Sequence, residues 1–353
     1  MHDMTKTTEI SINFLDAVIC LRTNNRAFAD YLKNYFSPLL YQGAPSENQM
    51  VINVMWEHER WEAILADLRL TATQVGGSAY LAPHKVAMVL KEERKILFTW
   101  EYTNEKQVVC DAIIRQWPLN YKWREYTERR NREERLYQIM LKTIYYPMFY
   151  YFQRMREMTM LHASAVIYKQ KGVVFCGLEG IGKTSYVLSL MERPETFFIS
   201  DNLLFADRKQ IYPCYELIRL HREQAALVND QYIRFNQSRC MKNFYMPPEN
   251  CLKNSVWPDL LIFVQFGDTH AVMPLPLEEA VARALHMSKL SGELQGYQAR
   301  YYLYNLLPRH KTSSEKDILH ALFEKTKCIC VQMNRHYTFE QNMKFMMQQI
   351  DCT

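Results

Sequence analysis

The stretch Gly177-Leu178-Glu179-Gly180-Ile181-Gly182-Lys183-Thr184 decides the fold class, because it fits the phosphate-binding pattern GxxxxGK[ST] at every fixed position. The apolar residues 172–176 before it predict a short buried strand, and residues 185–191 after it predict an amphipathic helix. Glycines let backbone N–H groups turn inward around phosphate oxygens, and a helix N-terminus adds partial positive charge there. Strand, loop and helix together predict a nucleotide-binding domain of the α/β class.

The two residues that end the pattern carry its chemistry. Lys183 can reach the β- and γ-phosphates, and the Thr184 hydroxyl can ligate Mg²⁺. A plain glycine turn between strand and helix is the alternative interpretation, but it leaves these two residues unexplained. We therefore expect ATP and Mg²⁺ as cofactors, with the nucleotide bound by Gly177, Gly180, Ile181, Gly182, Lys183, Thr184 and Ser185.

The composition is that of an ordinary globular protein. The 353 residues are 48% hydrophobic and 23% charged, and they suffice for two domains or for one large domain with an extension. No apolar run approaches the roughly 18 residues of a membrane span, and residues 1–6 lack the apolar core of a secretion signal. A net charge of +5 suits an anionic ligand without demanding nucleic acid. We expect a cytoplasmic protein that binds neither membrane nor nucleic acid.

The cysteines also indicate a cytoplasmic protein. All nine are scattered along the chain, odd in number and partly within apolar segments, which is typical of reduced thiols. Cys328-Ile329-Cys330 forms a CxC, but no second Cys or His pair lies near it in the sequence. The alternation predicts a strand rather than a metal site.

Two regions are expected along the chain. Residues 1–118 predict an N-terminal α+β domain, which includes a hairpin with arms at 85–90 and 95–100 and a charged turn at 91–94. Residues 119–160 predict helix, and strands alternate with helices from residue 161, so that 119–353 is expected to form the nucleotide-binding domain. The other predicted elements are strands at 9–22, 50–56, 161–168, 196–200, 260–266 and 328–333, and helices at 25–36, 277–290, 315–325 and 339–350.

Phosphoryl transfer needs an acid near the phosphate loop, and two acids follow apolar strands. Asp201 follows the predicted strand at 196–200, and Asp268 follows the one at 260–266 after a glycine. Ligands of α/β sheets bind at the carboxyl ends of strands, so both acids are candidates. Asp201 is favoured because its strand comes directly after the loop helix. The alternative role of Asp201 is to cap the next turn.

A histidine precedes the loop strand. A lone histidine such as His162 is more often a packed core residue, but the surrounding motifs form a set. Leu161-His162-Ala163-Ser164-Ala165-Val166, the phosphate loop with its strand, and Ser200-Asp201-Asn202 together resemble the HPr kinase/phosphorylase family. The closest resemblance is to the HPr-kinase-like proteins of peptide-modification gene clusters, lasso-peptide kinases included. It covers roughly residues 145–225.

The resemblance implies a fold and an activity. The fold is a P-loop kinase domain like the nucleotide domain of phosphoenolpyruvate carboxykinase. The activity is transfer of the ATP γ-phosphate to a serine hydroxyl of a protein, a peptide or a free amino acid. A ribosomally made precursor peptide is among the implied acceptors.

The resemblance also implies roles for residues. It implies that Lys183 binds phosphate, that Thr184 holds Mg²⁺ and that His162 lies beside the transferred phosphate. Asp201 matches the first acid of the family's Asp-Asp pair, as base or metal ligand. Asn202 departs from the pair, because an amide can orient a hydroxyl or ligate a metal but cannot accept a proton.

A later segment adds two weaker candidates. Glu216-Leu217-Ile218-Arg219 resembles a Glu-containing stretch further along the family. The resemblance implies that Glu216 is a second metal ligand and Arg219 a charge-stabilising group, whereas a surface-facing segment is the alternative for both. The favoured hypothesis is an ATP- and Mg²⁺-dependent kinase with a serine-type acceptor. The rival is a non-catalytic nucleotide-binding interaction or assembly protein. The oligomeric state stays open, a homo-oligomer included.

Overall fold

The computed structural model describes residues 7–43, 50–75, 79–82, 85–90, 96–104, 107–114, 132–234, 243–292, 294–295 and 313–352. In these ranges the chain is a mixed α/β protein with several sheets. It divides into two compact units, one containing the described residues up to Tyr151 and the other those from Phe152 onward.

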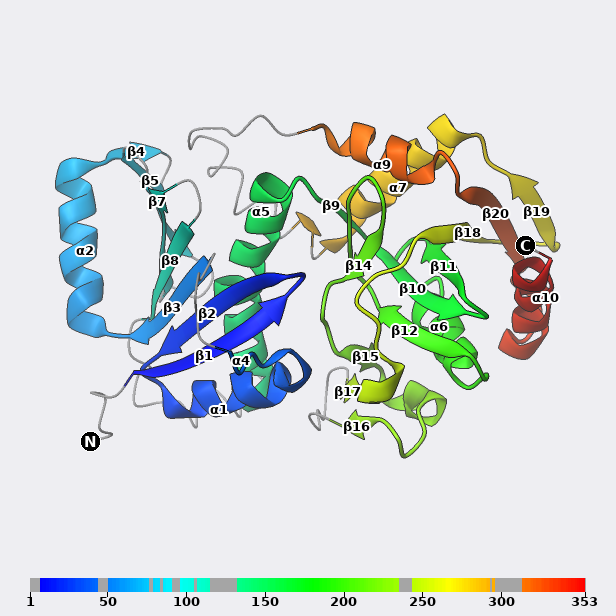
Figure 1. The fold of residues 1–353 in the computed structure, drawn as a ribbon, viewed down its shortest axis with the longest axis horizontal. Coiled ribbons are helices and arrows are strands. Elements are labelled where there is room, and N and C mark those ends of the chain that lie inside the picture. The colour runs from blue at the N-terminus through cyan, green and yellow to red at the C-terminus, as the bar shows by residue number, and fades with distance from the viewer. Residues whose placement is uncertain are drawn as a thin grey trace. The chain divides into compact units, whose positions relative to one another are not determined.

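The first unit is built on an eight-stranded sheet with the order β1-β2-β3-β8-β7-β6-β5-β4. Two helices accompany it: α1 (Arg26–Tyr35), whose N-cap Asn25 accepts a hydrogen bond from the backbone of Phe28, and α2 (His58–Thr71). Figure 1 shows these elements. The strands are β1 (Thr8–Phe14), β2 (Ala17–Thr23), β3 (Met50–Trp56), β4 (Thr73–Val75), β5 (Ala79–Ala82), β6 (Lys85–Leu90), β7 (Ile96–Asn104) and β8 (Gln107–Ile114).

Most of the expected elements of this unit are confirmed. The predicted hairpin corresponds to the antiparallel pair β6 and β7, and its turn at 91–94 lies outside the described residues. Helix α2 was not predicted. It buries Trp61 and Leu68, and Ile64 and Leu65 pack partly buried against the same core, so its sequence carries the three- and four-residue spacing of an amphipathic helix.

A helical segment links the two halves of the sequence. It consists of α4 (Arg132–Met140), a π-helical turn (Leu141–Tyr145) and α5 (Tyr146–Met155). The ring of Tyr145 packs edge-on against Tyr35 at 6.2 Å between centroids, and also contacts Phe36. These contacts place the helices up to Tyr151 with the first unit, whereas the sequence suggested a boundary at 118/119. Of the segment at 119–160 that was expected to be helical, 119–131 lies outside the described residues and a strand begins at Thr159.

The second unit is built on a six-stranded sheet with the order β12-β10-β11-β18-β20-β19. The strands β11, β18 and β20 are parallel, and β10 is antiparallel to both of its neighbours, so β12 runs in the same direction as β11. Edge strand β19 is antiparallel to β20. The bounds are β10 (Ala163–Tyr168), β11 (Lys171–Cys176), β12 (Thr196–Ser200), β18 (Pro258–Gly267), β19 (Ala271–Pro274) and β20 (Lys327–Asn334).

One irregularity interrupts this sheet. The pairing of β10 with β12 shifts between Ala165, which faces Ser200, and Val166, which faces Phe198. Ile199 is therefore an extra residue on β12 with no partner on β10, which is a β-bulge.

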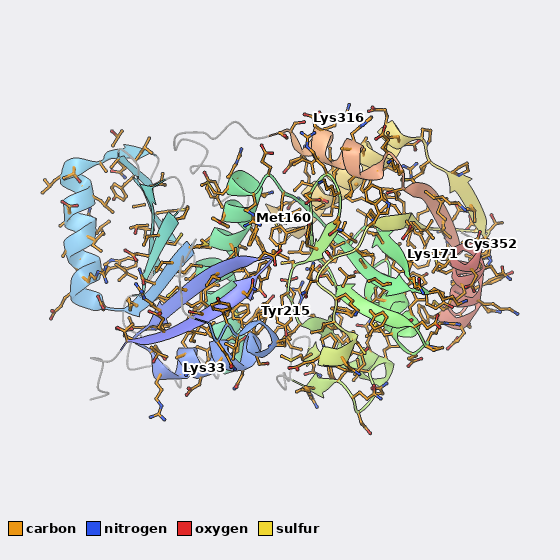
Figure 2. The ribbon with its side chains drawn as sticks, viewed as in Figure 1. Lys33, Met160, Lys171, Tyr215, Lys316 and Cys352 are labelled. Carbon is orange, nitrogen blue, oxygen red and sulfur yellow. The ribbon has the colours of Figure 1, made fainter. Side chains whose placement is uncertain are left out.

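Both faces of the sheet are covered by helices. Phe175 and Ile262 belong to the core beneath α6 (Lys183–Met191) and α10 (Phe339–Asp351). On the opposite face, the core contains residues of α7 (Leu277–Leu290) and α9 (Glu315–Phe323). Figure 1 shows α7 and α9 side by side, and Lys316 and Glu278 join them by an ion pair of 3.1 Å. Lys316 lies at the outer surface (Figure 2).

Two small sheets complete this unit and were not predicted. They have the orders β14-β13-β9 and β15-β17-β16. The strand expected at 161–168 is divided, because β9 ends at Leu161 and β10 begins at Ala163, with His162 between them. The bounds are β9 (Thr159–Leu161), β13 (Leu204–Ala206), β14 (Ile211–Pro213), β15 (Ile218–Leu220), β16 (Ile233–Arg234) and β17 (Asn243–Met246).

The remaining expectations for this part of the chain hold closely. Helix α7 has the predicted bounds, and α9 ends at Phe323 rather than at 325. Cys328 and Cys330 lie in β20, as the alternation indicated. No helix within the described ranges combines the length and apolar character needed to cross a membrane.

Candidate active site

The phosphate loop joins the end of β11 to the start of α6. Gly180 and Gly182 have φ angles of +83° and +96°, a conformation that side chains with a Cβ rarely adopt. Gly177 is needed for a different reason, since a Cβ there would lie 2.8 Å from Cγ2 of Ile181. Gly180 and Gly182 therefore meet a requirement of the backbone, and Gly177 meets one of close packing.

Lys183 begins α6 and folds back over the loop. Its buried ammonium group donates hydrogen bonds to the carbonyl oxygens of Gly177 at 2.8 Å and Leu178 at 3.0 Å. These bonds hold the cation at the mouth of the loop, where an ammonium can exchange carbonyl oxygens for phosphate oxygens.

The strand directions bring further residues to this edge of the sheet. The carboxyl ends of β11 and β12 lie at the same edge, together with the amino end of the antiparallel strand β10. Asp201 directly follows β12, and Ser164 is the second residue of β10. Topology therefore gathers the loop, an acid and a serine at one place.

The carboxylate of Asp201 accepts hydrogen bonds from the hydroxyl groups of Ser164 and Thr184. Ser164 Oγ donates to Oδ1 at 2.8 Å, and Thr184 Oγ1 lies 3.0 Å from Oδ1 and 3.1 Å from Oδ2. Burial raises the pKa of Asp201 above its usual value, while these two hydroxyls and the charges of Arg219 and Lys183 oppose the shift. The acid thus contacts the residue that the loop motif assigns to Mg²⁺.

The alternative acid lies elsewhere. Strand β18 continues from Phe263, which pairs with Cys176, to Gly267, about 13 Å further at about 3.3 Å per residue. Asp268 follows with its side chain 77% exposed, in an ion pair of 3.1 Å with Arg335. The structure places Asp268 at the surface and Asp201 at the loop.

His162 lies just before β10, the strand that pairs with the loop strand β11. It is buried, and it precedes Ala163, which pairs with the last residue of β11, Cys176. Its backbone N–H donates to Ser288 Oγ of α7 at 3.0 Å. His162 is therefore held at the same edge of the sheet as the loop.

A second group of polar residues adjoins Asp201. Asn202 has a φ of +82°, which asparagine tolerates better than most residues, and its Nδ2 donates to Oε2 of Glu216 at 3.0 Å. Arg219 lies 3.9 Å from the same carboxylate oxygen. Glu216 is buried rather than surface-facing, so the structure brings it together with the neighbour of Asp201.

Sequence reasoning assigned no role to Ser164. This fully buried residue donates to Asp201 and accepts a hydrogen bond from the backbone N–H of Asn202 at 3.3 Å. The signal was present in the stretch that follows His162, but the alternation of a strand does not reveal which residue of β12 it faces.

The residues around Asp201 fit a magnesium ion. Magnesium prefers oxygen ligands and is usually held by one or two carboxylates together with substrate phosphates. Thr184 and Asp201 offer a hydroxyl and a carboxylate beside the loop, and Glu216 is a further carboxylate nearby. Within the part of the chain that the structure describes, no three His, Cys, Asp or Glu side chains gather as a metal cage. Such a site would therefore need the phosphates of the nucleotide as ligands.

Of the comparisons with known proteins, the one with solved structures gave a match. No protein family matches the chain. No curated protein matches it either. Among solved structures, the Hpr(Ser) kinase/phosphatase from Coxiella burnetii is similar with 13% sequence identity and a TM-score of 0.25, over 54% of this chain and 99% of that chain.

Proposed function

We propose that this protein is a kinase that uses ATP and Mg²⁺ to phosphorylate a hydroxyl group of a serine-type acceptor. The observation that carries the proposal is the contact between Thr184, the last residue of the loop motif, and the buried carboxylate of Asp201. A loop that only binds phosphate has no need of a buried acid at this place, and burying a carboxylate is costly. The sequence resemblance to HPr-kinase-like proteins supports the same conclusion and implies a P-loop kinase domain of the phosphoenolpyruvate-carboxykinase type.

Each residue of the site has a proposed role. Lys183 exchanges its bonds to Gly177 and Leu178 for oxygens of the β- and γ-phosphates. The backbone of the loop, from Gly177 to Ser185, surrounds the phosphates, and Thr184, Asp201 and Glu216 would hold Mg²⁺. When bound, the metal neutralises charge on the phosphates.

The transfer itself needs little covalent work by the protein. The bond between the γ-phosphorus and the oxygen bridging to the β-phosphate breaks, and a bond from the γ-phosphorus to the acceptor oxygen forms. Asp201 accepts the proton of the acceptor hydroxyl, so the products are ADP and the phosphorylated acceptor. His162 and Arg219 are proposed to stabilise the charge on the transferred group.

The two regions of the chain have separate roles in this proposal. All of these residues belong to the region 119–353, which we assign to nucleotide binding and catalysis. We assign acceptor recognition to the N-terminal α+β region, 1–118. The acceptor would be a peptide, a protein or a small molecule, and a ribosomally made precursor peptide is the first to test.

The test is a transfer assay. The protein is incubated with γ-labelled ATP, Mg²⁺ and serine-bearing acceptors that include precursor peptides, with Asp201→Asn as the control. Label on the acceptor that needs Mg²⁺ and is lost in the control supports the proposal. Nucleotide binding without transfer to any acceptor contradicts it.

A second candidate function follows from Asn202. The resemblance implies a pair of acids here, whereas the position next to Asp201 carries an amide that donates to Glu216. A protein that binds ATP as a conformational or assembly ligand would need the loop and the metal site without a full set of acids. The transfer assay separates this candidate from the kinase.

A further inference from the structure

An aromatic side chain lies at the same edge of the sheet as the phosphate loop. Strand β20 runs parallel to β18, and β18 runs parallel to β11, so the chain leaves β20 at the edge where the loop lies. Phe339 is the first residue of α10, shortly after the end of β20, and is 36% exposed.

A second aromatic ring connects Phe339 to the loop. Tyr186 lies in α6, one turn after Lys183, and its Cε2 is 3.7 Å from the position that a Cβ on Gly182 would take. The rings of Tyr186 and Phe339 have their centroids 5.5 Å apart. The ring of Phe175 in β11 also stacks on Tyr186, with the centroids 5.7 Å apart. The three rings therefore form a row from the buried loop strand to the surface beside the loop.

The backbone around Phe339 is fixed by a capping box. The side chain of Thr338 accepts a hydrogen bond from the backbone N–H of Gln341 at 3.3 Å, and Gln341 Oε1 accepts one from the backbone of Thr338 at 2.9 Å. Phe339 is therefore supported from one side by a buried ring and held by a rigid helix start. An exposed aromatic ring held in this way can take a flat ligand without losing much conformational freedom.

We propose that Phe339 is the platform on which the purine base of the bound nucleotide stacks. This inference rests on the proposed nucleotide-binding function, because the loop must hold the phosphates for the base to reach the ring. Flat bases stack on aromatic side chains through their π-faces. The middle ring of the row, Tyr186, lies beside Gly182 of the loop and Phe339 lies next to it, so a nucleotide whose phosphates lie in the loop can extend its base toward Phe339.

The test compares a ligand that has a base with one that lacks it. Binding of Mg·ATP and of Mg·tripolyphosphate is measured calorimetrically for the natural protein, Phe339→Leu and Phe339→Trp. The Leu side chain keeps apolar contact with Tyr186 but has no aromatic face. We expect ATP to bind about 5- to 140-fold more weakly to Phe339→Leu, tripolyphosphate binding to be unchanged, and Phe339→Trp to keep its affinity for ATP.

Two controls keep the inference separate from the proposed function. Leu290→Ala removes another exposed apolar side chain, at the end of α7 on the opposite face of the sheet, and should leave both affinities unchanged. Lys183→Ala should weaken both ligands. Phe266 of β18 is another exposed aromatic side chain to compare. Equal ATP affinity in Phe339→Leu and the natural protein, or a loss found in Phe266→Ala instead, would overturn the inference while leaving the phosphate site intact. Failure of the natural protein to bind either ligand would overturn the proposed function itself.

Discussion

The hydroxyl of Thr184 reaches both carboxylate oxygens of Asp201, at 3.0 and 3.1 Å, and so connects the first turn of α6 to the end of β12. The two residues come from separate elements, and neither contact is possible unless β12 runs in the same direction as the loop strand. The loop and the acid therefore form one site, in which changes to either side chain should have separable effects.

Replacement of Lys183 by Ala should weaken ATP binding by about 10- to 100-fold. The variant loses a charge-assisted contact to phosphate, and such contacts contribute about 1.5–3 kcal/mol. Calorimetric titration with Mg·ATP measures the change. Lys316→Ala is the matched control, because Lys316 lies at the surface of α9 (Figure 2) and should have no effect. Unchanged affinity in folded Lys183→Ala would rule out the role assigned to Lys183.

Replacement of Asp201 by Asn should abolish transfer while keeping the fold. The single carbonyl oxygen of Asn can still accept the hydrogen bonds of Ser164 and Thr184, but it cannot accept a proton and binds Mg²⁺ weakly. A transfer assay and a thermal melt measure the two properties. The exposed Asp268 provides the control through Asp268→Asn, and loss of activity in that variant alone would show that the wrong acid was assigned.

The same variant should be more heat-stable than the natural protein when no nucleotide is bound. Burial raises the pKa of Asp201 in the folded state, so the folded protein holds this proton more tightly than the unfolded chain. The associated stability is complete below the pKa of the unfolded carboxyl, and it is lost as the pH rises through the folded pKa. Asn carries no such proton. The difference in Tm between Asp201→Asn and the natural protein should therefore grow from pH 4 to pH 7, and a difference that shrinks over this range would contradict the assignment.

Replacement of Asn202 by Asp should make the protein depend more strongly on Mg²⁺. The new carboxylate would stand where Nδ2 now donates to Glu216 at 3.0 Å, and two close carboxylates repel each other unless a cation lies between them. We expect a lower Tm without metal, and transfer at high Mg²⁺ that is kept or modestly raised. Asn202→Gly, which suits the positive φ and removes the amide, is the control. Clear transfer by Asn202→Asp with none by the natural protein would favour the non-catalytic ATP-binding protein.

A glycine of the phosphate loop should be more sensitive to replacement by Ala than a glycine outside it. Gly182→Ala should cost about 1–2 kcal/mol of stability, because Ala would have to adopt a φ of +96°. Gly292 is the matched control, since no atom lies within 4 Å of a Cβ added there. Denaturant melts compare the two variants. A loss in Gly292→Ala as large as that in Gly182→Ala would show that the left-handed conformation is not the cause.

Much of this site could be predicted from the sequence, because the loop motif is local. Its glycines, the strand before it and the helix after it lie within some 20 consecutive residues, and Asp201 follows the next strand along the chain. The contact between Ser164 and Asp201 could not be predicted in the same way, because it depends on which residues of β10 and β12 face each other. The small sheets of the second unit were missed for a related reason, since strands of two to four residues carry too few alternating positions to give a pattern.

The bulge at Ile199 decides which side of the sheet Asp201 occupies. In a regular strand, successive side chains alternate, so Phe198 and Ser200 would share one face and Asp201 would point to the other. Phe198 belongs to the core beneath α6, and Asp201 reaches Thr184 on that same helix. The extra residue therefore shifts the alternation of side chains between the two faces by one position, just before Asp201. A straight strand that kept Ile199 would turn the carboxylate toward α7 and α9, whereas deletion of Ile199 would leave Phe198 and Asp201 two positions apart and on the same face. The bulge is therefore as much a part of the site as the residues that line it.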